Sequence, residues 1–310
     1  MSALICGSLA YDTIMVFRDH FKNHILPDKI HILNVSFQVP VMRREFGGCA
    51  GNIAYNLKLL GGDPLPMGAA GSDFGPYAQW LDRWQIDQRY IKVLGDAYTA
   101  QAFITTDLDD NQITAFHPGA MNRSHEIAVA EASDATIGII SPDGRDGMIE
   151  HAAQFAQAGI PFFFDPGQGM PLFNGPELLR FVDQANWVTV NDYEAQLLQE
   201  RTGETIETLA RRVEALIVTL GAQGSKIYAD GKTINIPAVR ARDTRDPTGC
   251  GDAYRAGLLY GLMNRFDWET SGRVAALISA IKIAHTGTQN HRFTGEDFWN
   301  LFRVNFGYAP

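Results

Sequence analysis

Short apolar runs alternate with amphipathic stretches from about residue 135 onward. Each run is continuous and is bounded by Gly, Pro, Asp or Asn, as expected for strands that are buried on both faces of a parallel sheet. These runs cover residues 135–140, 160–164, 187–190 and 216–220. The stretches between them have helical spacing and capping residues, at 146–158, 175–185 and 193–201. This order predicts an α/β protein in which helices cover both faces of a mainly parallel sheet.

Two segments, residues 13–46 and 98–118, break this alternation because they are rich in strand-forming residues and lack a helical pattern. The second predicts a hairpin with strands at 100–105 and 113–116 around a polar turn. We expect the two segments to form a small antiparallel sheet laid against the main one. Such a sheet could be a lid over a site, a pairing surface between subunits, or both. The chain is therefore interpreted as one α/β domain with a lid.

Composition and charge narrow the class of protein. Residues 1–310 contain 45% hydrophobic and 20% charged residues, which is ordinary for a globular domain, and the apolar runs are too short for a membrane helix. A formal charge of -9 argues against nucleic acid and anionic membranes as partners, yet it allows a local phosphate site. The three scattered cysteines support neither a zinc site nor a disulfide framework. The N-terminus lacks a signal-peptide pattern, so we expect a cytoplasmic protein.

The strongest chemical signal lies in residues 246–252, with the sequence DPTGCGD. Gly249 and Gly251 flank the small Cys250, so the backbone can turn tightly and direct several N–H groups into one hollow. The helical run that follows directs its positive dipole end at the same hollow, which favours an anion. Asp252 stands at the rim, where its carboxylate could take a proton from a hydroxyl group. An anion cradle beside a base is what phosphoryl transfer to an alcohol needs. An isolated motif of this kind would be interpreted as a glycine helix cap.

Two elements near the N-terminus could hold a polyol. A strand-like apolar run covers residues 3–9. Asp12 comes just after it, at a sheet edge where ligands commonly bind, although an ordinary turn Asp is the alternative. Residues 47–52, GGCAGN, open a predicted helix. Gly48 permits close approach of the backbone, and Asn52 offers both a donor and an acceptor. The same pattern also fits a simple Gly-rich helix start, and it lacks the register of a dinucleotide fingerprint.

Two later elements could bind a metal ion and a nucleotide. Asn191 and Glu194 are three residues apart at the start of a helix, so their oxygens could hold Mg²⁺ through water. A capping box is the alternative there. The predicted strand at 216–220 leads into a glycine loop, where Thr219, Gly221 and Gly224 could surround a nucleotide, or form a plain turn. The sequence contains no GxxxxGK[ST] motif, so it is not a P-loop enzyme.

These elements stand in chain order at or near predicted strand ends, and together they resemble the ribokinase-like sugar and nucleoside kinases, also called the phosphofructokinase-B type family. The resemblance extends from Gly7 to about Phe293 and is closest at residues 246–257. It implies a three-layer α/β/α sandwich with a small β-sheet lid, and ATP and Mg²⁺ as cofactors. Many family members also bind a monovalent cation such as K⁺ near the anion cradle.

The resemblance also implies a role for each site residue. Asp252 would be the general base, and the N–H groups of Gly249, Cys250 and Gly251 would stabilise the transferred phosphoryl group. Asp12, Gly48 and Asn52 would bind the sugar, and Thr219, Gly221 and Gly224 would bind ATP. Asn191 and Glu194 would bind Mg²⁺. The monovalent cation would be bound by Asp246 and the backbone around Thr248, and the stretch 284–289 also aligns with this part of the family.

Several features favour a nucleoside, adenosine first, as the phosphate acceptor. Pro247, the loop at 164–169 and the tail at 282–291 look like those of bacterial adenosine kinases and broad-specificity nucleoside kinases. Ribokinase-type members often carry Asn two residues before the sugar-binding Asp, where this chain has Ala10. Aromatic residues in the two lid segments could stack on a base, namely Phe17, Phe37, Phe103 and Phe116. The alternatives are a kinase for a free sugar such as ribose and a non-catalytic nucleoside-binding protein. The expected partners are the nucleoside and ATP, and the protein would be a monomer or a lid-mediated homodimer.

Overall fold

Two sheets organise the part of the chain that the computed structural model describes, residues 1–25, 31–32, 34–109 and 111–310. The larger sheet has the strand order β13-β12-β11-β10-β9-β8-β1-β4-β5. Seven adjacent strands of this sheet are parallel, namely β11, β10, β9, β8, β1, β4 and β5. The antiparallel β12–β13 hairpin continues the sheet beyond β11 and forms one edge. The strands are β1 (Ser2–Cys6), β4 (Asp63–Gly71), β5 (Ile91–Leu94), β8 (Ala135–Ile140), β9 (Phe162–Phe164), β10 (Trp187–Asn191), β11 (Ala215–Thr219), β12 (Ser225–Ala229) and β13 (Lys232–Ile236).

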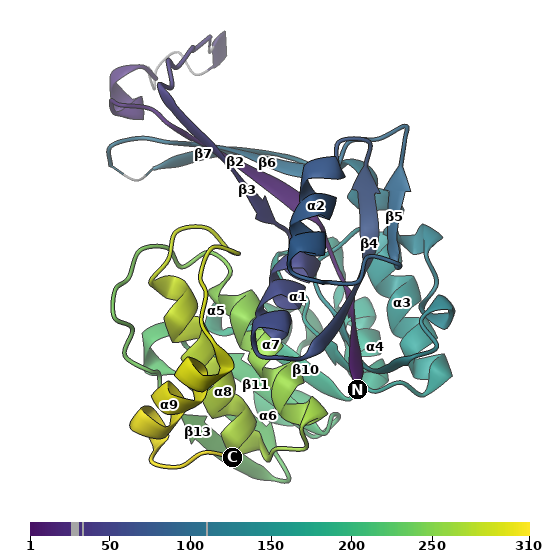
Figure 1. Ribbon diagram of the computed structural model, residues 1–310. Helices are drawn as coiled ribbons and strands as arrows, with labels where there is room; N and C mark the ends of the chain where they lie inside the picture. The colour runs from purple at the N-terminus through teal and green to yellow at the C-terminus, as the bar shows by residue number, and fades with distance from the viewer. Residues whose placement is uncertain (26–30, 33, 110) are drawn as a thin grey trace.

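Helices cover both faces of this sheet, which confirms the predicted three-layer fold (Figure 1). One face packs against α3 (Arg145–Ala158), α4 (Gly175–Gln184), α5 (Asp192–Thr202) and α6 (Ile206–Ala210). The other packs against α1 (Cys49–Leu59), α2 (Gly75–Arg83), α7 (Cys250–Met263) and α8 (Trp268–Ile283), with α9 (Gly295–Phe306) outside α8. Each face of the sheet has its own hydrophobic core, and alternate residues of a strand belong to one core or the other. Leu4 packs on one side and Ile5 on the other. Short 3₁₀ helices are η1 (Phe21–Asn23), η3 (Gly119–Glu126), η4 (Val129–Glu131), η5 (Gly167–Leu172) and η6 (Gly221–Gln223).

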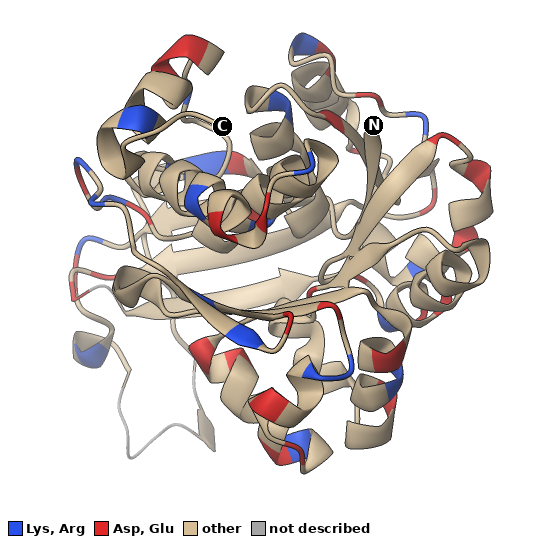
Figure 2. Cartoon of the chain, turned by 90° about the horizontal axis from the view of Figure 1, so that it is seen from below, with Lys and Arg blue, Asp and Glu red and all other residues tan. Residues whose placement is uncertain are grey.

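The predicted elements agree with the observed ones to within one or two residues. The strand expected at 160–164 begins only at Phe162, because Pro161 has no N–H to give to a ladder. The helix expected at 193–201 begins one residue earlier, at Asp192, and Asn191 caps it. No helix among the described residues is both long and apolar enough to span a membrane. Basic and acidic residues are interspersed along the ribbon in Figure 2.

The small sheet has the strand order β3-β2-β6-β7 and projects beyond the main sheet in Figure 1. Its strands are β2 (Ala10–Val16), β3 (Val41–Gly47), β6 (Ala100–Thr106) and β7 (Gln112–His117). The expectation of an antiparallel sheet is wrong at its centre, where β2 and β6 pair in parallel. Both strands leave the carboxyl end of the main sheet and therefore run in the same direction. Residues 26–30, 33 and 110 of the expected lid segments lie outside the described part. The role of this sheet as a lid, and the assignment of the whole chain to one domain, stay predictions.

Candidate active site

A cavity of about 1420 Å³ opens at the carboxyl ends of the parallel strands, beside the small sheet. It brings together every predicted site residue except Asp246, although these residues are spread over more than two thirds of the sequence. The predicted residues in its wall are Asp12, Gly48, Asn52, Asn191, Glu194, Thr219, Gly221, Gly224, Thr248, Gly249, Cys250, Gly251 and Asp252. Clustering at this edge follows from the topology, because loops after parallel strands all emerge on one side of the sheet.

Asp252 lies in the first turn of α7, and its carboxylate is tied to α1. The side-chain amide of Asn52 donates a hydrogen bond to Oδ2 of Asp252 over 2.8 Å. Burial raises the pKa of Asp252 to about 6, and the nearby Asp165 carboxylate adds to the rise while Arg255 opposes it. A carboxylate with a pKa near 6 is still charged at pH 7 and is a better proton acceptor than an exposed one.

The loop before Asp252 has the backbone geometry that an anion cradle requires. Gly249 is the N-cap of α7 with φ of 79°, a left-handed conformation that only glycine adopts readily. The amide of Cys250 already donates to the carbonyl of Pro247 at 3.1 Å. By contrast, the amides of Gly249 and Gly251 have no acceptor among the described residues. These two amides, with the positive end of the α7 dipole, can therefore receive an anion. Burial raises the pKa of Cys250 to about 11, so its thiol is neutral.

Two glycines bring the backbone close to the expected sugar site. A Cβ on Gly47 would lie 2.6 Å from Oδ2 of Asp12, and a Cβ on Gly48 would lie 2.5 Å from the carbonyl oxygen of Ser8. Gly48 also has φ of 83°. The carboxylate of Asp12 thus lies close against Gly47, just before the start of α1. Burial, together with the charges of Glu45 and Asp246, raises the pKa of Asp12 to about 6.

Asn191 and Glu194 form the capping box that was the alternative to a metal site. Oδ1 of Asn191 accepts from the Glu194 amide at 2.7 Å, and the Asn191 amide donates to Oε2 of Glu194 at 2.8 Å. Both residues nevertheless line the cavity, and the other carboxylate oxygen of Glu194 takes no part in the box. A hydrated Mg²⁺ ion fits this arrangement, because it needs one or two carboxylates and keeps most of its waters.

Thr219 ends β11, and Gly221 and Gly224 bracket η6 at the same side of the cavity. Gly224 has φ of 87°, and a Cβ there would lie 2.0 Å from the carbonyl oxygen of Ile236. Glycine is therefore required for the chain to turn back into β12. This turn presents backbone groups, with no bulky side chain, to the part of the cavity beside Glu194.

Asp246, expected to take part in binding a monovalent cation, already has partners at its carbonyl and at its carboxylate. The carbonyl oxygen of Asp246 accepts a hydrogen bond from Nζ of Lys282 at 2.7 Å. The carboxylate oxygens of Asp246 accept from the amides of Thr248 and Gly287, both at 2.9 Å. Asp246 is thus a structural link behind the cradle, and an ammonium group already lies against its carbonyl.

The sequence reasoning missed a buried ionic cluster at the floor of the cavity. Arg255 binds both carboxylate oxygens of Asp165, at 3.0 and 2.9 Å, and its Nη2 lies 3.8 Å from Oε2 of Glu194. Arg255 and Asp165 are both almost fully buried. The signal was available: Arg255 lies three residues after Asp252 on one helix face, and Asp165 directly follows a predicted strand.

Only one of the four candidate stacking residues reaches the cavity. Phe116 on β7 lines it, next to Ala102 of β6. Phe103 lies on the opposite face of the small sheet, because successive residues of a strand alternate. Phe17 and Phe37 pack against each other and Phe21, with ring centroids 4.8 to 5.9 Å apart.

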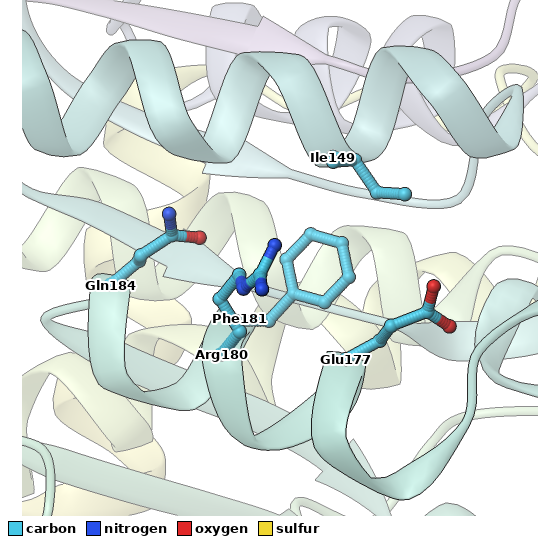
Figure 3. A pocket seen from close by; sticks show the side chains of 5 residues that line it. All are labelled: Ile149, Glu177, Arg180, Phe181 and Gln184. Atoms are coloured by element: carbon cyan, nitrogen blue, oxygen red, sulfur yellow. The ribbon is translucent and has the colours of Figure 1, made fainter.

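A second hollow, between α3 and α4, has a volume of only about 40 Å³ (Figure 3). Ile149 faces it from α3, and α4 supplies Glu177, Arg180, Phe181 and Gln184. None of the residues with predicted chemistry lies there. The hollow has room for no more than a few water molecules.

The family model of the pfkB family carbohydrate kinases matches residues 10–293. The chain belongs to this family. Its relatives include the nucleoside kinase of Methanocaldococcus jannaschii, 32% identical over 260 residues that cover 83% of this chain and 85% of the relative. The nucleoside kinase of Methanothermobacter thermautotrophicus is 30% identical over 305 residues, which cover 96% and 98%. The structure of Burkholderia thailandensis nucleoside kinase in complex with inosine is 53% identical, with 99% of each chain covered and a TM-score of 0.91. These likenesses to pfkB kinases confirm the expected family and the ribokinase-like fold.

Proposed function

We propose that this protein transfers the γ-phosphoryl group of ATP to the 5′-hydroxyl of a nucleoside, with the purine nucleosides adenosine and inosine as first acceptors. The observation that carries the proposal is the convergence of Asp252, Asn52 and Asp12 with the amides of Gly249 and Gly251 in one cavity. A cavity of about 1420 Å³ has room for a nucleoside and a nucleotide together. Relatives named nucleoside kinases support the choice of acceptor, and a relative was solved with inosine.

In this proposal one set of residues binds the nucleoside and another set binds ATP. Asp12 and Gly48 hold the ribose hydroxyls, and Phe116 stacks on the base. Asp252 takes the proton of the attacking hydroxyl. The amides of Gly249 and Gly251 stabilise charge on the phosphoryl group. The turn around Thr219, Gly221 and Gly224 surrounds ATP.

Mg²⁺, when bound with ATP, would neutralise charge on the phosphates. Glu194 is the residue that would hold it through water, and Asn191 would orient Glu194 through the capping box. The bidentate pair of Arg255 with Asp165 fixes the guanidinium next to Glu194 and so limits the movement of that carboxylate. A potassium ion is left out of the proposal, because Lys282 already donates to the carbonyl of Asp246.

A comparison of acceptors tests the proposal. Release of ADP would be measured with adenosine, inosine, cytidine and ribose at equal concentrations, and the product nucleotides identified by chromatography. Turnover of the nucleosides with little turnover of ribose is the expected result. Turnover of ribose alone would replace the nucleoside with a free sugar. Binding of nucleosides without release of ADP would make the protein a non-catalytic binder.

Location and assembly extend the proposal. The three cysteines are free, in keeping with a reducing cytoplasm.

On the face of the small sheet opposite the cavity, Met42, Phe103 and Ile113 are exposed, and a second copy of the chain would cover them in a homodimer. Sedimentation velocity on the wild type and on Met42→Lys distinguishes this homodimer from a monomer.

A further inference from the structure

Lys282 is a fully buried lysine whose acceptors are backbone carbonyls. It lies in the last turn of α8 and has 0% exposure. Its Nζ donates to the carbonyl oxygen of Asp246 at 2.7 Å and to that of His285 at 3.4 Å. Lysine is seldom fully buried, because removing its ammonium group from water is costly unless strong acceptors surround it. A cage of loop carbonyls is the environment in which proteins bind potassium.

The carbonyls around Lys282 belong to segments that meet behind the anion cradle. Asp246 opens the cradle loop, and its amide and that of Arg245 donate to the carbonyl of Ile283 at 3.2 and 2.9 Å. The Asp246 carboxylate then joins the cradle loop, through the Thr248 amide, to the loop after α8, through the Gly287 amide. The ammonium group therefore lies where the end of α8, the cradle loop and residues 284–289 come together.

We infer that the ammonium group of Lys282 takes the place of a monovalent cation behind the anion cradle, so that this kinase works without potassium. The inference rests on the proposed kinase activity. Lys282 acts here as a positioning residue: it does not line the cavity, but it holds the Asp246 carbonyl from which the cradle loop begins. A positive charge at this place draws the loop carbonyls away from the cavity, so that the amides of Gly249 and Gly251 face it. It also lies at the C-terminal end of α8, where the helix dipole favours a cation.

The charge of Lys282 depends on its surroundings. Burial lowers its pKa, while the carboxylates of Asp246 and Asp252 act in the opposite direction. Lys282 and Cys250 of the cradle affect each other: Lys282 lowers the pKa of Cys250, although burial raises it, and Cys250 raises the pKa of Lys282. The ammonium group is therefore close enough to influence groups at the cradle itself.

The first experiment uses the wild-type enzyme. Its kcat and its KM for ATP are measured in potassium, sodium and choline chloride at one ionic strength. All three salts should give values that agree within about twofold. Stimulation by potassium of about fivefold or more, the range of ordinary coupling between two ligands, would overturn the inference.

The second experiment removes the ammonium group and offers a free cation in its place. Lys282→Ala should lose about 100-fold in kcat in choline chloride, with KM for the nucleoside within about threefold of the wild type. Addition of about 0.1 M potassium or ammonium should raise the kcat of Lys282→Ala by at least about tenfold. Lys282→Met should stay inactive in every salt, because its thioether chain fills the space. Lys226→Ala, at an exposed lysine of β12, is the matched control and should behave as the wild type. Full activity of Lys282→Ala in choline, or a loss that neither cation repairs, would contradict the inference.

Thermal unfolding gives a readout that does not depend on turnover. Potassium should raise the Tm of Lys282→Ala above its value in choline chloride and leave that of the wild type unchanged. An equal response of the two proteins would speak against the inference. If Lys282→Ala does not fold in any salt, the salt comparison on the wild type still decides. If the wild type phosphorylates no acceptor, the proposed function fails, and the Tm comparison still tests Lys282.

Discussion

The side-chain amide of Asn52 donates a hydrogen bond to Oδ2 of Asp252 and joins two residues that are 200 positions apart. The orientation of this amide is set from behind, because Nε2 of Gln289 donates to Oδ1 of Asn52 at 3.0 Å. Gln289 itself donates to Tyr77 and accepts from Trp80. The Asn52 oxygen is thus engaged, and its nitrogen is directed at the carboxylate. Asn52, expected only as a sugar ligand, also orients the candidate base.

Replacement of the base tests this assignment most directly. Asp252→Asn keeps the shape of the side chain and removes the proton acceptor, so kcat should fall by about 10²–10⁴-fold. The dissociation constant for the nucleoside should change little, and calorimetric titration would measure it. Asp243→Asn, at an exposed carboxylate that pairs with Arg245, is the control. Near-normal turnover of Asp252→Asn would mean that another group takes the proton.

Activity should decline in mild acid. The pKa of Asp252 is raised to about 6, and the base acts only when it is deprotonated. Below pH 6, kcat/KM should therefore fall by about tenfold for each pH unit. The free energy of unfolding has the opposite dependence on this group. The pKa of Asp252 in the folded state lies above its value in the unfolded state. The contribution of Asp252 to stability is therefore present below about pH 4 and is lost as the pH rises to about 6. Asp252→Asn should then be more stable than the wild type at pH 7, by about 1–3 kcal/mol. A kcat/KM that stays flat down to pH 5 would contradict the base assignment.

The sequence was sufficient to predict which residues meet in one cavity, but not which contacts join them. Residues 246–252 and the pattern at Asn191 and Glu194 carry local chemistry, and the parallel topology then requires their loops to meet at one sheet edge. Contacts such as Asn52 with Asp252 depend on how α1 packs against α7, which no local pattern contains. The parallel pairing of β2 with β6 was missed for the same reason, because hairpin signals report only neighbouring strands. Lys282 carries no local signal, because basic residues are common in the last turn of a helix, and its burial and its carbonyl acceptors are seen only in the structure.

The ion pair of Arg255 with Asp165 should matter for stability more than any surface pair. Arg255→Met leaves a buried carboxylate without its partner, and the free energy of unfolding should fall by about 3–5 kcal/mol. The double variant Arg255→Met/Asp165→Leu should recover most of this loss, because neither charge then remains. Arg212→Met, which breaks an exposed pair with Asp183, should cost less than about 1 kcal/mol. Urea denaturation measures all three, and equal losses for Arg255→Met and Arg212→Met would show that burial of the pair is unimportant.

Specificity for nucleosides should depend on which face of the small sheet an aromatic residue occupies. Phe116 lines the cavity, while Phe103 lies on the opposite face, and both side chains are about half exposed. Stacking on a base is worth about 1–3 kcal/mol, so Phe116→Ala should raise KM for adenosine and inosine by about 5- to 150-fold. Phe103→Ala is the matched control, because it removes an equal side chain from the same sheet, and it should leave KM within about twofold. Steady-state kinetics on both variants would decide, and an equal change in the two would mean that the base does not stack on β7.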